Sequence, residues 1–357
     1  MISLEQESGR KKIDEIDREI VRLLDERVGI CKEIGRAKAE QKAAVFDSAR
    51  EKEVLERVAS VATQASGEGV KSVYREIISM CRNVQKPTIV AFLGPEGSFS
   101  HEAARTTFGS SSEYLSCRKI GEIFSKVELG GADLGVVPLE NSLEGPINET
   151  LDRLLEYPLS IVGEAQLRVS QNLIVHPQTE SLSQIERLYS HPQALAQCDA
   201  YISKYLSHAE VVMTDSTARA AEHVLRDKSG AAIGSKIAAE LNELKVFASG
   251  IEDRPNNYTR FVVVGKNGPP TKGEKTSLLF SVDNVPGAVS AVLTEFARCG
   301  INITMILSRP MEQRPWEYFF FLDFEGNAGE PKCSTALKAA REKTGILRVL
   351  GSYSRLR

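Results

Sequence analysis

The sequence predicts a multidomain chain with an all-α segment, an α/β domain and an α+β domain in succession. Helical periodicity dominates to about residue 85, short apolar strands alternate with helical stretches from Ile89, and a different strand–helix order begins at residue 276. A chain of 357 residues is also long for a single hydrophobic core. We place the domains at residues 1–87, 88–266 and 276–353.

The pattern of the first segment predicts three helices of unequal length. Residues 10–42 carry apolar side chains at helical spacing without a proline, which predicts a helix of about 30 residues that needs a partner along its length. Ser48 with Glu51 three residues later resembles a capping box, so a second helix should begin there and run to about Gln64. A third helix should end at Gln85. Such a set makes a poor monomeric core, and we expect a homodimer or a higher homo-oligomer.

The middle section alternates short apolar strands with helical stretches, which predicts an α/β domain with its loops at the strand ends, where ligands usually bind. The expected strands are Ile89–Leu93, Leu134–Val137, Leu173–Val175, Val211–Met213, Ala231–Ile233 and Phe261–Val264, and the expected helices are 101–108, 120–129, 194–206, 217–226 and 236–242.

The last section follows a turn-rich segment at Asn267–Lys275. Its elements follow the order βαββαβ, a ferredoxin-like arrangement. The expected elements are strand 276–283, helix 287–299, strand 301–308, strand 316–324, helix 333–343 and strand 346–353.

Bulk composition excludes several classes of protein. A formal net charge of −3 gives no broad reason to expect nucleic acid or an anionic membrane as a partner, and no apolar run approaches the roughly 18 residues of a membrane span. The six cysteines are scattered without a CxxC pair, and the five histidines form no HExxH pair. We therefore expect reduced thiols, no metal, no cofactor and a cytoplasmic location, since Met1–Arg10 also lacks the apolar core of a signal peptide.

Two cationic side chains of the long first helix lie on the same helix face. Arg27 and Lys38 fall within about 20° of one helix face and about 16 Å apart, a gap that suits a small dicarboxylate. Arg10 lies about 25 Å before Arg27 and is rotated about 100° off that face, so it can join the same site only from another subunit. Considered as charges alone, these residues fit a solvated helix surface equally well.

The spacing of these residues resembles the all-helical chorismate mutases over residues 10–85. The resemblance rests on Arg10, Leu24-x-x-Arg27, Gly35-Arg36-Ala37-Lys38, Asp47-x-x-Arg50-Glu51 and Gln85. It implies an intertwined dimer in which Arg10, Arg27 and Arg50 bind the two carboxylates of chorismate. It further implies that Lys38 and Gln85 are catalytic donors to the ether oxygen, and that Glu51 and the Asp47 region hold the ring hydroxyl. Cys81 stands where some relatives have Ser, and a thiol is the weaker donor.

Four loops rich in Gly, Pro, Asn and Ser stand out in the middle section. Each adjoins an expected strand, so their hydroxyl and amide groups can converge on one cleft, although turns use the same residues. The loops are GPEGSFSHEAA (94–104), VVPLENSLEGPINETLDRL (136–154), YSHPQALAQC (189–198) and NNYTRF (256–261).

In this order the four loops resemble prephenate dehydratase from about Ile89 to Gly265. The resemblance implies two α/β lobes like a type II periplasmic binding protein, with substrate between them. It makes Thr259 the essential residue, as a hydrogen-bond donor to the departing hydroxyl of prephenate. His101 is a further candidate proton source, as is His191. The remaining candidates for lining the cleft are Asn141, Ser142, Ser190, His191, Gln193 and Arg260.

The βαββαβ pattern resembles the ACT domain that accompanies prephenate dehydratases and binds phenylalanine at a dimer interface. The stretches that carry that function in relatives read Pro286-Gly287-Ala288-Val289-Ser290 and Leu307-Ser308-Arg309-Pro310 here, with Asn302 nearby. Leu307 replaces the usual Glu and Met305 a common basic residue, so we expect phenylalanine to bind more weakly than in such relatives. A dimerisation domain that senses nothing is the alternative.

Together these resemblances imply a bifunctional enzyme that takes chorismate and then prephenate as substrates, and phenylalanine as effector. Two other functions stay open from the sequence. One is a dehydratase that prefers arogenate, with a mutase segment kept mainly for dimerisation. The other is a non-catalytic metabolite sensor, against which Thr259 argues because a sensor has no need of it.

Overall fold

The computed structural model describes residues 4–41, 45–266, 273–311 and 314–356. The chain divides into two compact units. The first comprises Met1–Asp47, Glu53–Thr88 and Phe108–Glu113, and the second comprises Ser48–Lys52, Ile89–Thr107 and Tyr114–Arg357. Among the described residues, no helix has both the length and the apolar character that a membrane span requires.

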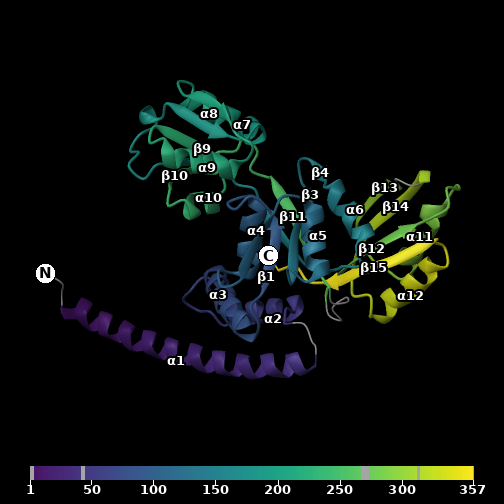
Figure 1. Ribbon diagram of the computed structural model, residues 1–357. Helices are drawn as coiled ribbons and strands as arrows, with labels where there is room; N and C mark the ends of the chain where they lie inside the picture. The colour runs from purple at the N-terminus through teal and green to yellow at the C-terminus, as the bar shows by residue number, and fades with distance from the viewer. Residues whose placement is uncertain (1–3, 42–44, 267–272, 312–313, 357) are drawn as a thin grey trace. The chain divides into compact units, whose positions relative to one another are not determined.

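The three predicted N-terminal helices are confirmed as α1 (Leu4–Glu40), α2 (Ser48–Ser60) and α3 (Gly67–Gln85). The first is one unbroken helix of 37 residues (Figure 1), which corresponds to about 55 Å. The predicted capping box at Ser48 is wrong. Because α2 begins at Ser48 itself, its hydroxyl lies inside the first turn, and within the described part of the chain that buried oxygen has no hydrogen-bond partner.

The dehydratase-like part of the second unit contains two sheets. The first has the strand order β2-β1-β3-β11-β5, with β4 paired to β3. Strands β1 and β3 run parallel, whereas β11 is antiparallel to both β3 and β5. Its strands are β1 (Ile89–Leu93), β2 (Glu113–Cys117), β3 (Leu134–Asn141), β4 (Gly145–Pro146), β5 (Ser160–Arg168) and β11 (Tyr258–Gly265), and its helices are α4 (Phe99–Phe108), α5 (Ile120–Leu129) and α6 (Asn148–Glu156).

The second sheet has the strand order β10-β6-β9-β7-β8 and apolar residues on both faces. Alternate strand positions pack against α7 and α8 on one face and against α9 and α10 on the other, as Figure 1 shows. Its strands are β6 (Asn172–Val175), β7 (Arg187–Ser190), β8 (Glu210–Met213), β9 (Gly230–Gly234) and β10 (Lys245–Ser249), and its helices are η1 (Leu182–Gln184), α7 (Pro192–Gln197), α8 (Asp199–Tyr205), α9 (Thr217–Arg226) and α10 (Lys236–Leu241).

Two chain segments connect these lobes, one after β5 and the other before β11. They are hydrogen-bonded to each other, from Val169 N–H to Asn257 O at 2.8 Å and from Ile251 N–H to Gln171 O at 3.0 Å. The two lobes confirm the two-lobed domain that the resemblance implied, and the paired double connection is a feature that the structure adds.

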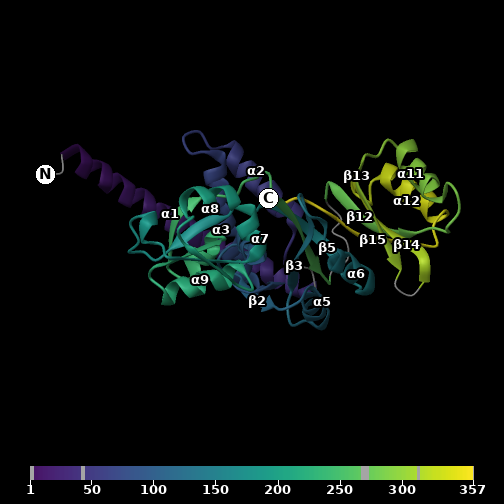
Figure 2. The ribbon, with the colours of Figure 1, turned by 90° about the horizontal axis from the view of Figure 1, so that it is seen from above.

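The C-terminal part is a four-stranded antiparallel sheet in the order β13-β14-β12-β15, with both helices on one face (Figure 2). Its elements are β12 (Lys275–Ser281), α11 (Ala288–Arg298), β13 (Ile303–Met311), β14 (Arg314–Glu325), α12 (Pro331–Arg341) and β15 (Ile346–Tyr353), which confirms the predicted βαββαβ order. The opposite face joins the dehydratase core, because Leu279, Phe321 and Leu350 pack in one cluster with Val137 and Val262.

Several local predictions are wrong, and one falls mostly on residues outside the described ranges. The expected helix 194–206 is two helices, separated at Cys198, and the sequence reading missed β2, β5, β7, β10 and α6. Most of the predicted turn segment 267–275 lies outside the described residues. All six cysteines are free, as predicted.

Candidate active sites

In the helical unit, one end of α1 packs against α3. The Arg27 guanidinium donates a hydrogen bond to Cys81 Sγ, so the predicted carboxylate ligand and the thiol lie side by side. Lys38 Nζ donates to the backbone oxygen of Val45 at 3.0 Å, which holds the ammonium at the end of the same helix. Arg27 and Lys38, which were predicted to share one helix face, therefore both bind groups that lie against the C-terminal half of α1, namely Cys81 Sγ and the Val45 carbonyl.

Gln85 lies at the closest approach of the two helices. A Cβ on Gly35 would stand 2.9 Å from Gln85 Cα, so this crossing requires glycine. Gln85 Oε1 is buried and finds no hydrogen-bond partner within the described part of the chain. Gln85, the last residue of α3, packs against Gly35, three residues before Lys38 on α1, and its partly unsatisfied amide is a group that a bound ligand can satisfy.

The other predicted mutase residues are dispersed in a single chain. Arg10 lies on the exposed N-terminal part of α1, 17 residues before Arg27, and Asp47 directly precedes α2. Arg50 and Glu51 lie in the first turn of α2; residues Ser48–Lys52 of this helix belong to the second unit, and the rest of the helix belongs to the first.

In the dehydratase-like domain, Thr259 pairs with Asn141 across two antiparallel strands. Asn141 Nδ2 donates to Thr259 Oγ1 at 2.9 Å and to Asn257 Oδ1 at 2.8 Å. Asn141 Oδ1 accepts from the backbone N–H groups of Leu143 and Glu144, which fixes the orientation of the amide. The Thr259 hydroxyl is therefore an acceptor toward Asn141 and keeps its own proton for donation.

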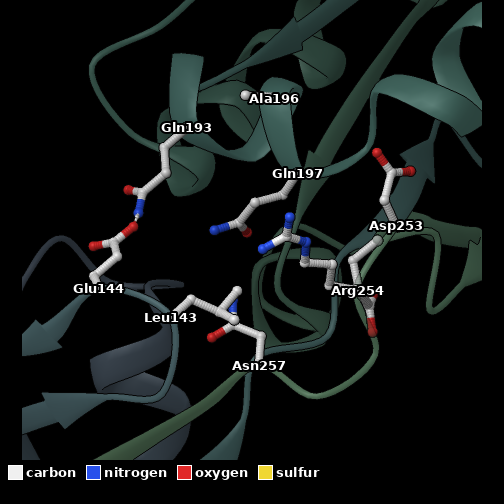
Figure 3. A pocket seen from close by; sticks show the side chains of 9 residues that line it. Leu143, Glu144, Gln193, Ala196, Gln197, Asp253, Arg254 and Asn257 are labelled. Carbon is white, nitrogen blue, oxygen red and sulfur yellow. Dashed lines mark hydrogen bonds between the residues drawn. The ribbon is translucent and has the colours of Figure 1, made fainter.

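A cavity of about 390 Å³ adjoins this group between the lobes. Figure 3 shows Gln193 of α7 pointing toward Glu144, to which it donates a hydrogen bond, and Arg254 pointing toward Gln197. A cavity of this size suits a small ligand. Its lining is Leu143, Glu144, Gln193, Ala196, Gln197, Glu252, Asp253, Arg254 and Asn257.

The cavity lining contains residues that the sequence reading missed. Arg254 and Asn257 precede the Thr259 strand in the connection from β10. Asn257 is the second residue of the NNYTRF loop, and Arg254 lies two residues before that loop, which is the only signal that could have indicated it. Glu252 lies deeper and is neutralised by Arg168 at 2.9 Å. Arg254 is thus an exposed cation at the cavity, beside the amides of Gln197 and Asn257.

Three predicted cleft residues make local hydrogen bonds within the domain. Ser190 is fully buried and donates to Ile233 O at 2.9 Å. His191 is the N-cap of α7, where its ring accepts from Gln193 N–H. Ser142 donates to Asn256 O at 3.0 Å and accepts from Tyr258 N–H, which ties two loops together.

The prediction that Arg260 lines the cleft beside Thr259 is corrected by the strand geometry. Consecutive residues of a strand point to opposite faces, so Arg260 points away from Asn141. Its guanidinium instead contacts Glu164, Tyr353 and Met305.

His101 is a structural acceptor rather than a proton source at neutral pH. Its Nδ1 accepts from Gly97 N–H at 3.1 Å, and the ring stacks on Phe92 at 4.4 Å between centroids. Burial, aided by the nearby Arg105 charge, lowers the pKa of His101 to about 4. The imidazole is therefore neutral where the enzyme would work.

This pKa predicts a pH dependence of stability. Below pH 6.5 the unfolded state takes up a proton that folded His101 refuses, so stability is complete above that pH and falls toward pH 4, by at most about 3 kcal/mol. The His101→Gln protein should not show this loss of stability at acid pH. Its melting temperature should lie below that of the wild type at pH 7.5, and the difference between the two proteins should shrink as the pH falls to 4.5. Parallel pH profiles for the two proteins would contradict the assignment.

The predicted effector residues fall at the start of helix α11 and along or just before strand β13 of the C-terminal domain. Gly287, with φ at +82°, is the N-cap of α11 before Ala288, and Asn302 immediately precedes β13. On β13, Leu307 packs into the core shared with the dehydratase lobe, and Arg309 forms an ion pair with Asp152 of α6 at 2.5 Å. Ser308 lies between them on the opposite, exposed face.

Family models match the chain in three successive ranges. Residues 9–86 match chorismate mutase type II, residues 90–269 match prephenate dehydratase, and residues 276–342 match the ACT domain. These matches, with the cavity beside the Asn141, Asn257 and Thr259 group, define a multidomain enzyme with a small-molecule-binding regulatory module.

Individual relatives agree with these matches. The bifunctional chorismate mutase/prephenate dehydratase of Aquifex aeolicus is 41% identical over 350 residues, which cover 96% of each chain. The prephenate dehydratase of Arthrobacter aurescens, solved in complex with L-Phe, is 33% identical with a TM-score of 0.68 and covers 75% of this chain and 90% of its own. A structure described as GqqA, a novel type of quorum-quenching acylase, is also 33% identical, with a TM-score of 0.68, and covers 75% of this chain and 98% of its own. This chain belongs to the bifunctional chorismate mutase/prephenate dehydratase family.

Proposed function

We propose that the helical domain rearranges chorismate to prephenate and that the two-lobed domain converts prephenate to phenylpyruvate, under feedback control by phenylalanine. The order of matched domains supports this pairing, because the product of the first reaction is the substrate of the second. The observation that carries the second reaction is the Thr259 hydroxyl, which Asn141 orients as a donor. The same Asn141 amide nitrogen binds Asn257, which lines the cavity.

The mutase reaction is pericyclic and needs neither a nucleophile nor a proton transfer. The protein has to hold a compact conformer and stabilise the charge that develops on the ether oxygen. Arg27 supplies a cation for a carboxylate, and Lys38 with the Gln85 amide supplies donors for the ether oxygen. The packing of α1 on α3 at Gly35 supports these roles, because it fixes Gln85 against the helix that carries both cations.

The active mutase is a homodimer in this proposal. The exposed fractions of Ile13, Ile16 and Ile20 on α1 are 57%, 58% and 48%, so a row of large apolar side chains is left open along the helix. A helix of about 55 Å with such a face needs a second helix to cover it, and another copy of α1 supplies the same pattern. A partner α1 would also bring Arg10 to the Arg27 and Lys38 end.

In the dehydratase reaction, prephenate loses its ring carboxylate as CO2 while the ring hydroxyl leaves, and aromatisation drives both steps. Thr259 donates a hydrogen bond to the departing hydroxyl. This hydrogen bond becomes stronger as negative charge develops on the hydroxyl oxygen. Arg254 is the cation placed to hold the pyruvyl carboxylate. The ring carboxylate should be oriented without being held strongly, since tight binding in the ground state would oppose its loss.

An acylase activity, suggested by one relative's description, is less compatible with this site. A hydroxyl nucleophile needs an adjacent base that accepts its proton. The partner of Thr259 is the Asn141 amide nitrogen, a donor that cannot accept one. Six free thiols support a reducing compartment, and we place the enzyme in the cytoplasm.

Product analysis with chorismate as the only substrate tests the function. The purified protein should form phenylpyruvate by way of prephenate, and arogenate should react more slowly than prephenate. If neither prephenate nor phenylpyruvate forms, the proposed function is wrong.

Phenylalanine should inhibit the second step, so prephenate should accumulate when L-phenylalanine is added to that reaction. Coupling of this kind typically changes affinity by about 5- to 150-fold. D-phenylalanine serves as the matched control, since it should have no effect. Calorimetry that detects no binding of L-phenylalanine at millimolar concentration would leave the C-terminal domain as a dimerisation element.

A further inference from the structure

Arg260 follows Thr259 in β11 and has a different environment. Thr259 faces Asn141 on the cleft side, whereas the Arg260 side chain, 12% exposed, enters the junction between the dehydratase lobe and the ACT sheet. Here β3 has an extra residue, Leu139, between the partners of Arg260 and Phe261. A bulge of this kind changes the direction of neighbouring side chains, so the local geometry of Thr259 depends on what fixes this point of the strand.

The Arg260 guanidinium is held by four other strands. It donates to Glu164 of β5 at 2.7 Å and to Tyr353 Oη of β15 at 3.0 Å. It also forms an ion pair with Asp323 of β14 at 2.6 Å and contacts Met305 Sδ of β13 at 3.3 Å. Three of these four strands belong to the ACT sheet, so one dehydratase side chain is anchored to most of the regulatory sheet.

The anchoring groups are buried and themselves tightly held. Asp323 and Glu164 have side chains 0% and 1% exposed, and Lys275 bridges them at 3.4 Å and 2.8 Å. Ser277 donates to Asp323 and exchanges a hydrogen bond with Tyr353 at 2.6 Å. We call Glu164, Arg260, Lys275, Asp323 and Tyr353 the Arg260 cluster.

Charge within the cluster is matched. Burial raises the pKa of Glu164, but the Arg260 and Lys275 charges outweigh it and hold the pKa below its usual value. A buried ionic cluster of this kind contributes little net stability compared with apolar packing, and its strongest use is to specify one geometry. That geometry is the position of β11 against the ACT sheet.

We propose that Arg260 is a positioning residue for the dehydratase reaction: through Asp323 and Tyr353 it ties the strand that carries Thr259 to the ACT sheet. The inference rests on the proposed role of Thr259. Arg260 does not touch the substrate in this proposal. When Arg260 loses Asp323 or Tyr353 as a partner, the Thr259 hydroxyl should be displaced while every substrate contact is kept. Displacement by about 1 Å is sufficient to lower a rate by up to a hundredfold.

The test compares Asp323→Asn and Tyr353→Phe with the wild type in the full-length protein. Asp323→Asn keeps the shape and removes one of the two carboxylate charges that hold Arg260, and kcat for added prephenate should fall about tenfold or more with KM nearly unchanged. Tyr353→Phe removes one acceptor and should lower kcat about threefold. Mutase activity of the same preparations should stay at the wild-type level.

Glu295→Gln is the matched control. Glu295 is a nearly buried carboxylate of the same domain, paired with Arg298 and Lys343 and remote from Arg260 in the contacts it makes. Unchanged kcat in both test variants would overturn the proposal, and so would equal losses in the test and control variants. If Asp323→Asn does not fold, Tyr353→Phe decides the question by the same criteria. A wild type that fails to dehydrate prephenate instead rejects the proposed function.

Discussion

Lys38→Ala should lose chorismate mutase activity by about 100- to 1,000-fold, as expected for removal of one charge-stabilising donor. Its dehydration of added prephenate should stay near the wild-type rate, because Lys38 and Thr259 lie in different domains and different compact units. Thr259→Ala should do the opposite, with a loss of about 100-fold or more from the missing donor to the leaving hydroxyl.

Lys32→Ala is the control for the first substitution. Lys32 is an exposed cation of the same helix, rotated about 120° from Lys38, so its removal changes net charge and helix composition equally. Asn141→Asp provides a second check, since it replaces the amide donor to Thr259 by a carboxylate and should lower only dehydration. Loss of both activities in a folded Lys38→Ala protein would contradict the claim of independent sites.

Arg10→Ala and Arg27→Ala should each abolish mutase activity alone, yet regain it when the two chains are mixed. In the proposed dimer, each site combines Arg10 of one chain with Arg27 of the other. A mixed dimer then has one site with both arginines and one with neither. With random exchange, half of the dimers are mixed, so activity should return to about a quarter of the wild-type level.

This complementation is measured after co-refolding or co-expression with two different affinity tags, so that mixed dimers are purified before the assay. Dehydratase activity of the same sample reports the amount of folded protein. If tagged mixed dimers form and remain as inactive in the mutase reaction as each parent, then Arg10 does not act across the dimer.

The strong local patterns in the sequence predicted much of the fold. Strand Ile89–Leu93 and helices 120–129 and 217–226 have the predicted bounds, because their apolar spacing and end signals agree. Strand β5 was missed because SIVGEAQLR contains Gly163, Glu164 and Ala165, which have low strand propensity, and the burial of Glu164 depends on distant cations.

The candidate dehydratase site was only partly predictable, for a physical reason. Asn141 and Thr259 lie 118 positions apart and meet through a strand pairing that no local pattern determines. Arg254 and Asn257 line the cavity from a connection without periodicity. Arg260 was misplaced because the sequence motif suggested a shared role with Thr259, whereas strand alternation sends the two side chains to opposite faces.

The most direct test of two reactions at two sites is a mass balance for Thr259→Ala supplied with chorismate alone. With two independent sites, chorismate should disappear at the wild-type rate and prephenate should accumulate in equal molar amount, with almost no phenylpyruvate at neutral pH. Addition of the Lys38→Ala protein to the same reaction should then convert the accumulated prephenate to phenylpyruvate. Chorismate that remains unconsumed, or phenylpyruvate that forms at the wild-type rate, would contradict two reactions at two separate sites.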